Sequence, residues 1–189
     1  MRIRTLFIII LSLNGSLVFS QSENTALILI DIQEFYFDQN KMPLKGNIEA
    51  TKIAFKILDH FRENNMLIIH VRHKDGGEIH EIVEPLYNEI IVEKSEVNAF
   101  RDTELLALLK ENNIENLVLL GMQTHMCLEA ATRAGVDFGF NCSVIHDACA
   151  TRDLEFNGHI TPAKDVHSST LNTLKSYAKV LSAEEFLQQ

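Results

Sequence analysis

Positive charge is scarce in this sequence. Its 17 lysine and arginine residues stand against 26 aspartate and glutamate residues, which gives a formal net charge of −9 at pH 7. No run of basic residues interrupts this excess of acidic side chains. Because phosphate backbones and anionic lipid headgroups repel such a chain, the composition argues against nucleic acid or an anionic membrane surface as a partner.

An apolar run of the usual membrane-spanning length is also missing. The stretch TLFIIILSLNGSLVF has 15 residues and contains Asn14 and Gly15, whereas a spanning helix needs ~20 apolar residues. It follows the basic start MRIR and ends in VFS, a small-x-small cleavage site, before Gln21. This pattern predicts a signal peptide over residues 1–20 and an exported protein, periplasmic or secreted. A membrane anchor is the alternative. No cysteine directly follows the stretch, so a lipid-anchored form is not expected.

Cysteine is limited to three residues, an odd number for a compartment that permits disulfides. Cys142 and Cys149 could pair, but the first begins a predicted strand at residues 142–146. An extended run of seven residues, as between Cys142 and Cys149, separates its ends by ~20 Å, which is beyond disulfide reach. We therefore expect two buried thiols and one reactive thiol, Cys127. The sequence has no Cys-x-x-Cys pair and no G-x-G-x-x-G fingerprint, which disfavours a thiol redox protein and a dinucleotide-binding domain.

Strands and helices are predicted to alternate along one domain, residues 21–189, without an internal repeat or a linker. Apolar runs predict strands at residues 26–30, 67–71, 90–92, 117–120, 142–146 and 177–181. Helices are predicted in segments between and after these strands. They start at or near Asn47, Asp102, Cys127, Thr161-Pro162 and Ser182 with Glu185. This alternation predicts a three-layer α/β/α fold around a mostly parallel, six-stranded Rossmann-like sheet.

An acid, a lysine and a cysteine each follow a different predicted strand. Asp31, Lys94 and Cys127 should meet at the carboxyl edge of the sheet, where ligands bind in such folds. Each has a simpler interpretation alone: a strand cap, a surface charge and a small core residue. At a helix start, backbone N–H groups and the helix dipole stabilise an anion, so the Cys127 thiol is expected to ionise more readily than a free thiol.

Four segments carry a resemblance to a known family: ALILIDIQ, VEKSEVNAF, GMQTHMCLEAATRAG and VIHDACATRD. Over the whole predicted mature chain the sequence resembles the isochorismatase-like cysteine hydrolases. The resemblance implies that Cys127 attacks a carbonyl carbon, that Asp31 is the acid and base, and that Lys94 stabilises the thiolate. It also implies a cis peptide bond between Met122 and Gln123, and an oxyanion hole formed by the backbone N–H groups of Gln123 and Cys127.

The retained cysteine favours cleavage of a C–N bond in a small amide through a thioester. An isochorismatase-type vinyl-ether hydrolase and a non-catalytic binding protein on the same fold remain the alternatives. The side chains expected to define the substrate give a partly aromatic pocket without a clear charge selector: Gln33, Phe35, Phe37, Phe100, Gln123 and His125.

No metal or other cofactor is expected. The nicotinamidase branch of the family carries an Asp-x-His motif, whereas the corresponding segment here, HVRHKDGGEIHE, has His70, His73 and His80 but no such motif. The expected partners are a small-molecule substrate and further copies of the chain. Members of the family commonly form dimers or tetramers, often with the pocket completed by a neighbouring subunit.

Overall fold

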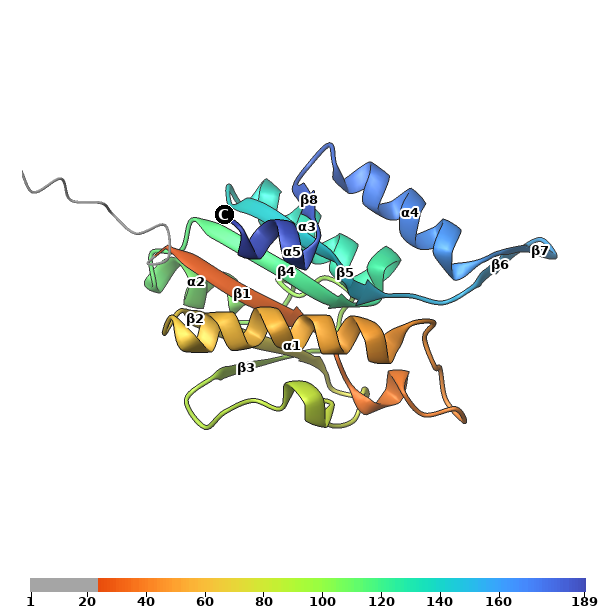
Figure 1. Cartoon of the computed structure of the whole chain (residues 1–189), viewed down its shortest axis with the longest axis horizontal. Helices are drawn as coiled ribbons and strands as arrows, with labels where there is room; N and C mark the ends of the chain where they lie inside the picture. Colours follow the sequence, from red (N-terminus) through yellow and green to blue (C-terminus); the bar gives the residue numbers. More distant parts are fainter. Residues whose placement is uncertain (1–23) are drawn as a thin grey trace, which may run out of the picture.

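The computed structural model describes residues 24–189 (Figure 1). The predicted signal peptide, residues 1–20, lies outside the described part of the chain. Within the described part, no helix combines the length and the apolar character needed to cross a membrane.

A six-stranded sheet forms the centre of the fold, in the order β3-β2-β1-β4-β5-β8 (Figure 1). Every pair of neighbouring strands is parallel, which confirms the predicted fold class. The strands are β1 (Thr25–Ile30), β2 (Leu67–His73), β3 (Ile90–Lys94), β4 (Asn116–Met122), β5 (Asn141–Ala150) and β8 (Lys179–Leu181).

Helices cover both faces of this sheet. On one face α1 and α5 lie together, with the rings of Phe61 and Phe186 stacked at 6.2 Å, and α2, α3 and α4 lie on the other face (Figure 1). The helices are α1 (Asn47–Glu63), α2 (Leu105–Glu111), α3 (Glu129–Asp137), α4 (Ala163–Leu174) and α5 (Ala183–Leu187). Strands covered on both faces must be apolar throughout, which is why β1 is buried along its whole length.

The strand order reverses between β1 and β4. After β1 the chain builds β2 and β3 on one side, then returns with β4 to the other side of β1. The carboxyl ends of these two strands therefore open a crevice, the usual ligand position in such sheets. Gly121 brings the strands close there. Its φ is +119°, and a Cβ atom at this position would overlap the carbonyl oxygen of Ile30.

The segment after the fifth predicted strand differs from the prediction. β5 continues to Ala150, where a polar loop was expected after residue 146. Its register against β4 shifts, so that Leu119 pairs with Val144 but Gly121 pairs with Cys149. The extra residues of β5 form an irregularity of the bulge type, which alternation in the sequence does not reveal. The expected loop also contains a hairpin of β6 (Leu154–Phe156) and β7 (His159–Thr161), which projects from the body (Figure 1).

Several element starts differ from the predicted ones by a few residues. Asp102 adopts a left-handed φ of 55°, so α2 begins only at Leu105. α1 begins at Asn47, but Gly46 is its N-cap, and α4 begins one residue after Pro162. The last strand begins at Lys179, not at residue 177. The capping box of Ser182 and Glu185 at the start of α5 is confirmed.

Candidate active site

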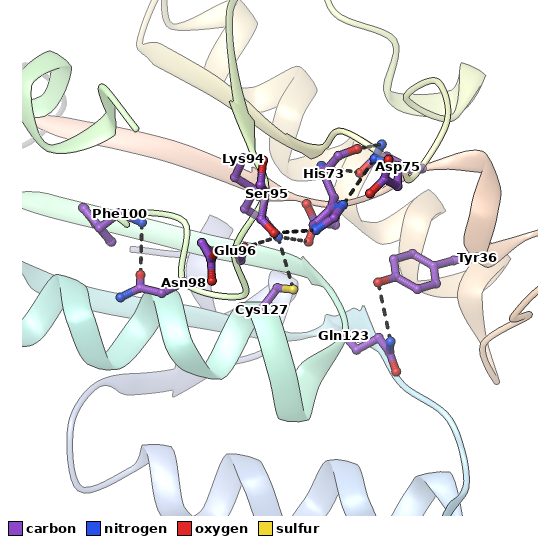
Figure 2. A network of polar contacts seen from close by, with 12 residues as sticks. Tyr36, His73, Asp75, Lys94, Ser95, Glu96, Asn98, Phe100, Gln123 and Cys127 are labelled. Atoms are coloured by element: carbon purple, nitrogen blue, oxygen red, sulfur yellow. Dashed lines mark hydrogen bonds and ion pairs between the residues drawn. The ribbon is translucent and has the colours of Figure 1, made fainter. Parts of the chain in front are cut away.

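Three side chains meet at the carboxyl edge of the sheet, as predicted. Asp31 directly follows β1, Lys94 ends β3, and Cys127 lies in η3 (Thr124–Leu128), a turn of π-helix between β4 and α3. The Nζ atom of Lys94 lies 2.7 Å from Oδ2 of Asp31. It also lies 3.3 Å from Sγ of Cys127 (Figure 2). Their exposed fractions are 1%, 1% and 5%, so the contact is shielded from solvent.

Asp31 is held in an uncommon backbone conformation. Its φ is +49°, its N–H donates to the carbonyl oxygen of Val71 at 2.9 Å, and its side chain is buried. A left-handed conformation in a residue other than glycine costs about 1–3 kcal/mol, and such residues cluster at active sites and ligand clamps. Within residues 24–189, neither carboxylate oxygen accepts a hydrogen bond in good geometry, although Oδ2 has its ion pair with Lys94. Burial raises the pKa of this carboxyl group, and the ammonium opposes the rise.

Lys94 is completely enclosed by acceptors. Besides its contacts with Asp31 and Cys127, Nζ donates to the carbonyl oxygen of Glu96 at 3.1 Å (Figure 2). An ammonium group has three protons, and these three neighbours match them. β2 lies between β3 and β1. A side chain on β3 must therefore be long to reach the carboxylate of Asp31 at the end of β1.

The predicted acidity of the Cys127 thiol is wrong for this arrangement. Burial and the Asp31 carboxylate raise the pKa of Cys127 to about 12, against the opposing effect of Lys94. The ammonium already neutralises the carboxylate, so a thiolate would add an unbalanced charge to a buried site. The thiol also does not lie at the first turn of α3, which begins two residues later at Glu129. The site therefore rests with a neutral thiol beside an ion pair.

The turn that carries Cys127 contains the cis peptide bond implied by the resemblance. The peptide bond between Met122 and Gln123 is cis. The carbonyl oxygen of Gln123 accepts hydrogen bonds from the N–H groups of Met126, at 3.0 Å, and Leu128, at 3.3 Å. The bond from Leu128 spans five residues, which is the wider spacing of a π-helix, and Cys127 lies within this turn.

A cavity of about 280 Å³ opens above the sulfur. Cys127 lines it, whereas Asp31 and Lys94 are not among its lining residues. Its size is slightly below the range of ~300–1,000 Å³ typical of drug-sized ligand sites, so it suits a small molecule. Its walls come from the ends of β2 and β4, from η1 (Glu34–Tyr36) and from the loops nearby. The lining residues are Gln33, Phe35, Tyr36, Met42, His73, Asp75, Gly76, Val97, Gln123, Met126, Cys127 and Arg152.

One wall of this cavity is a polar chain of three side chains. Gln123 donates through Nε2 to Oη of Tyr36 at 3.5 Å, and its Oε1 accepts from Nε of Arg152 at 3.2 Å (Figure 2 shows the first contact). Burial raises the pKa of Tyr36 to about 12, so its hydroxyl group stays protonated. No clear charge selector was expected in the pocket, and the expected substrate residues did not include Arg152 or Asp75, which both line the cavity. Arg152 had a signal in the sequence, since it belongs to the segment VIHDACATRD.

Of the residues predicted to define the substrate, Phe35 and Gln123 line the cavity. Gln33 also borders it, but its side-chain amide is fully used by a neighbouring loop. Nε2 donates to the carbonyl oxygens of His73 at 3.0 Å and Gly77 at 2.7 Å, and Oε1 accepts from the N–H of His73 at 2.7 Å. Gln33 therefore holds the cavity wall in place and has no free donor for a ligand.

Three other predicted substrate residues lie away from the cavity. Phe37 packs its ring on His80 at 3.9 Å. Phe100 is buried against the rings of Phe138 and Phe140, apart from Cys127 (Figure 2). The Nδ1 atom of His125 lies 2.6 Å from the hydroxyl oxygen of Thr151, and neither residue lines the cavity. Aromatic composition alone did not distinguish core and loop packing from the pocket wall.

The histidines considered for a metal have separate partners. His70 contacts Glu89 at 2.8 Å, His73 contacts the carbonyl oxygen of Ser95 at 3.1 Å, and His80 packs on Phe37. Within the described residues, no group of three or more His, Cys, Asp or Glu side chains is arranged to hold a metal ion. All three cysteines are free and buried.

Comparison with known proteins identifies the family. The model of the isochorismatase domain matches residues 25–185. The isochorismatase family protein YddQ of Bacillus subtilis is 39% identical over 178 residues, covering 87% of this chain and 99% of the relative. A solved structure from Oleispira antarctica, named as an isochorismatase hydrolase, superposes with a TM-score of 0.85 at 41% identity, covering 90% of this chain and 99% of its own. The chain belongs to the isochorismatase family, and it is a hydrolase.

A more distant relative has a named activity. Streptothricin hydrolase of Streptomyces noursei is 29% identical over 147 residues, which cover 68% of this chain and 50% of the relative. This similarity agrees with hydrolysis as the class of reaction.

Proposed function

We propose that this protein hydrolyses a C–N bond of a small amide through a thioester on Cys127, without a metal ion. One observation carries the proposal: the ammonium group of Lys94 touches both the carboxylate of Asp31 and the sulfur of Cys127. The sulfur lies at the base of a cavity sized for a small molecule. A nucleophile beside an acid–base group, with a cation to stabilise the anion, is the arrangement that covalent acyl transfer requires.

Charge balance decides how the thiol is activated. At rest the carboxylate and the ammonium cancel, and the thiol is neutral. If the proton of Cys127 moves to Asp31, the acid becomes neutral and the thiolate takes over the ion pair with Lys94. The net charge of the buried group is therefore the same before and after the transfer. The raised pKa of Asp31 helps this carboxylate to accept the proton. Loss of the proton to solvent would instead change the net charge of the buried group.

The acylation half of the reaction follows from these positions. The sulfur of Cys127 attacks the carbonyl carbon while its proton passes to Asp31. The negative charge on the carbonyl oxygen is stabilised by the backbone N–H groups of Gln123 and Cys127, which serve as the oxyanion hole. Asp31 then donates the proton to the amine nitrogen, the C–N bond breaks, and an amine leaves. Cys127 remains as a thioester of the acyl group.

Deacylation uses the same groups in reverse order. A water molecule enters where the amine left, and Asp31 accepts one of its protons as the oxygen attacks the thioester carbon. The C–S bond breaks, the carboxylic acid is released, and the proton on Asp31 returns to the sulfur. Lys94 stabilises the departing thiolate at each stage.

A trapping experiment tests this function. The protein is incubated with a panel of small amides, and ammonia or amine release is followed together with hydroxylamine capture of an acyl group. Wild-type protein should release amine and form a hydroxamate, while Cys127→Ala should do neither. Cys142→Ala is the matched control, because this buried thiol lies outside the cavity. Undiminished turnover by Cys127→Ala would contradict the proposal.

Export and self-association belong to the same proposal. Residues 1–20 have the signal-peptide pattern described above, and removal before Gln21 would leave the whole matched domain intact. The intact mass of the protein recovered from the periplasm or the medium should be that of a chain that begins at Gln21. Light scattering of that mature protein should give a dimer or a tetramer; a full-length, monomeric product would contradict both parts.

A further inference from the structure

Arg152 differs from every other arginine in residues 24–189. The others each form an ion pair: Arg62 with Glu89, Arg72 with Glu78 and Glu93, Arg101 with Glu96 and Asp102, and Arg133 with Glu129. Arg152 has no carboxylate partner among the described residues, although the chain carries a net charge of −9. An arginine left unpaired in so acidic a protein has its charge available for a ligand.

The position of Arg152 directs that charge into the cavity. Its side chain lines the cavity that contains the sulfur of Cys127. Of its donors only Nε has a hydrogen-bond partner in the described part of the chain, the Oε1 atom of Gln123 at 3.2 Å. This bond fixes the plane of the guanidinium group and leaves both terminal nitrogens without acceptors. Such a pair of parallel donors matches the two oxygens of a carboxylate.

Tyr36 supplies a second donor on the same wall. Its hydroxyl oxygen accepts from Nε2 of Gln123 at 3.5 Å, and no acceptor for its own proton lies within the described residues. Gln123 therefore bridges Tyr36 and Arg152, and each of these two side chains has donors without a hydrogen-bond partner within the described residues. The donors are Arg152 on one side and Tyr36 on the other, and both line the cavity.

We propose that Arg152 and Tyr36 form a carboxylate subsite, so that the substrate is a small amide that also carries a carboxylate group. The inference rests on the proposed function for the reaction, while the binding part stands by itself. The surrounding net negative charge repels anions at long range, so recognition of an anionic amide needs a local cation of this kind. Asp75 also lines the cavity, but it is exposed and forms no ion pair with Arg152.

Matched pairs of small amides test the subsite. Succinamate and malonamate each differ from succinamide and malonamide only in having a carboxylate in place of one amide, and glycinamide represents a cationic amide. Binding is measured by calorimetry on Cys127→Ala, which cannot form a thioester. The amic acids should bind at least about tenfold more tightly than the diamides, as expected for a charge-assisted hydrogen bond. Equal binding of acids and diamides, or a preference for glycinamide, would overturn the subsite.

Variants of the wall assign the effect to its residues. In the Cys127→Ala background, Arg152→Gln should abolish the preference for the amic acids, Arg152→Lys should keep part of it, and Tyr36→Phe should weaken it. Thermal unfolding of each variant shows whether it is folded. A preference that survives Arg152→Gln in a folded protein would place the carboxylate elsewhere and overturn the assignment.

Turnover by the wild-type protein separates this inference from the proposed function. If the amic acids bind through Arg152 but no amide in the panel releases ammonia, the subsite stands and the hydrolase function fails. If the diamides are hydrolysed as fast as the amic acids and Cys127 is required, the hydrolase function stands and the subsite is overturned. Absence of both binding and turnover for every probe would overturn the subsite as well.

Discussion

The Oδ2 atom of Asp31 lies 2.7 Å from the Nζ atom of Lys94, and the two side chains are almost completely buried. Burial raises the pKa of the neighbouring Cys127 thiol to about 12, and the Asp31 carboxylate adds to this rise. Because the Lys94 ammonium is already paired with Asp31, it opposes the rise only in part. In the proposed mechanism, Cys127 is therefore activated by transfer of its proton to Asp31 within the site and not by standing ionisation.

A substitution at Asp31 should separate thiol reactivity from catalysis. Asp31→Asn removes the anion that raises the pKa of Cys127 and leaves the ammonium of Lys94 unopposed beside the sulfur. The pKa of the thiol should therefore fall, and alkylation of Cys127 by iodoacetamide near pH 8 should become faster than in the wild type. Hydrolysis should be lost at the same time, because no group remains to carry the proton to the leaving amine.

Peptide mapping supplies the control for this measurement. Burial also raises the pKa values of Cys142 and Cys149 to about 12, and both lie away from Asp31. Their alkylation should be slow in both proteins. Slower alkylation of Cys127 in Asp31→Asn than in the wild type would show that the carboxylate acidifies the thiol, contrary to the charge balance described here.

The buried ion pair should also matter for stability. Lys94→Met leaves the Asp31 carboxylate buried without its cation, and loss of one partner of a buried pair typically costs about 3–5 kcal/mol. Urea denaturation should show a decrease of this order in the free energy of unfolding. The matched control is Arg101→Met, whose exposed contacts with Glu96 and Asp102, at 3.7 and 3.6 Å, should contribute about 0–1 kcal/mol. Equal losses in the two variants would contradict the account of the pair.

The parts of the fold that follow from local sequence were predictable. Apolar runs marked the buried strands, since a parallel sheet covered on both faces leaves no polar positions in its interior. All strands of a parallel sheet end at the same edge, so Asp31, Lys94 and Cys127 could be placed together at that edge without knowledge of the strand order. The carboxyl-edge rule carried this inference over separations of 63 and 33 residues.

What the sequence did not reveal depends on contacts between distant segments. The extension of β5 to Ala150 is set by its register against β4, which no local pattern encodes. The raised pKa of Cys127 arises from burial and from the carboxylate of Asp31, so it could not be obtained from helix position alone. Arg152 follows β5, yet its role as a wall residue became visible only through its contact with Gln123.

The loop that Gln33 binds offers a steric test. A Cβ atom at Gly76 would lie 2.5 Å from Nε2 of Gln33, whose buried amide is fixed by the bonds to His73 and Gly77. Gly76→Ala should therefore lower the free energy of unfolding by about 1–3 kcal/mol, the usual cost of overpacking. In a Gln33→Ala background the added methyl group has room, and most of this cost should disappear in a double-mutant cycle.

Gly139 is the control for that cycle. It has a φ of +94°, and a Cβ atom added there would have no neighbour within 4 Å, so Gly139→Ala tests backbone strain without a steric contact. Its cost, about 1–2 kcal/mol for a left-handed residue, should be the same with and without Gln33. A cost of Gly76→Ala that is equally independent of Gln33 would show that the clash with the amide is not its cause.

Acid should weaken the fold through His70. This side chain is buried in β2, its Nε2 contacts Glu89 at 2.8 Å, and its Nδ1 has no hydrogen-bond partner within the described residues. Burial lowers its pKa below the ordinary value of 6.5, although Glu89 opposes the shift. The unfolded chain therefore binds the proton more tightly than the folded protein does. The stability from a neutral His70 is present above the unfolded pKa and is lost as the pH falls through it toward the folded pKa.

The variant His70→Gln tests this linkage, because its amide can still donate to Glu89 but does not titrate. Glu89 also keeps its bonds from Arg62, at 2.6 and 2.9 Å, so the carboxylate stays paired in the variant. Between about pH 7.5 and pH 5.5 the wild type should lose more of its free energy of unfolding than His70→Gln does. Burial lowers the pKa values of His125 and His167 too, so a smaller loss common to both proteins is expected. Urea denaturation at each pH measures the difference, and parallel pH profiles would show that protonation of His70 does not limit stability in this range.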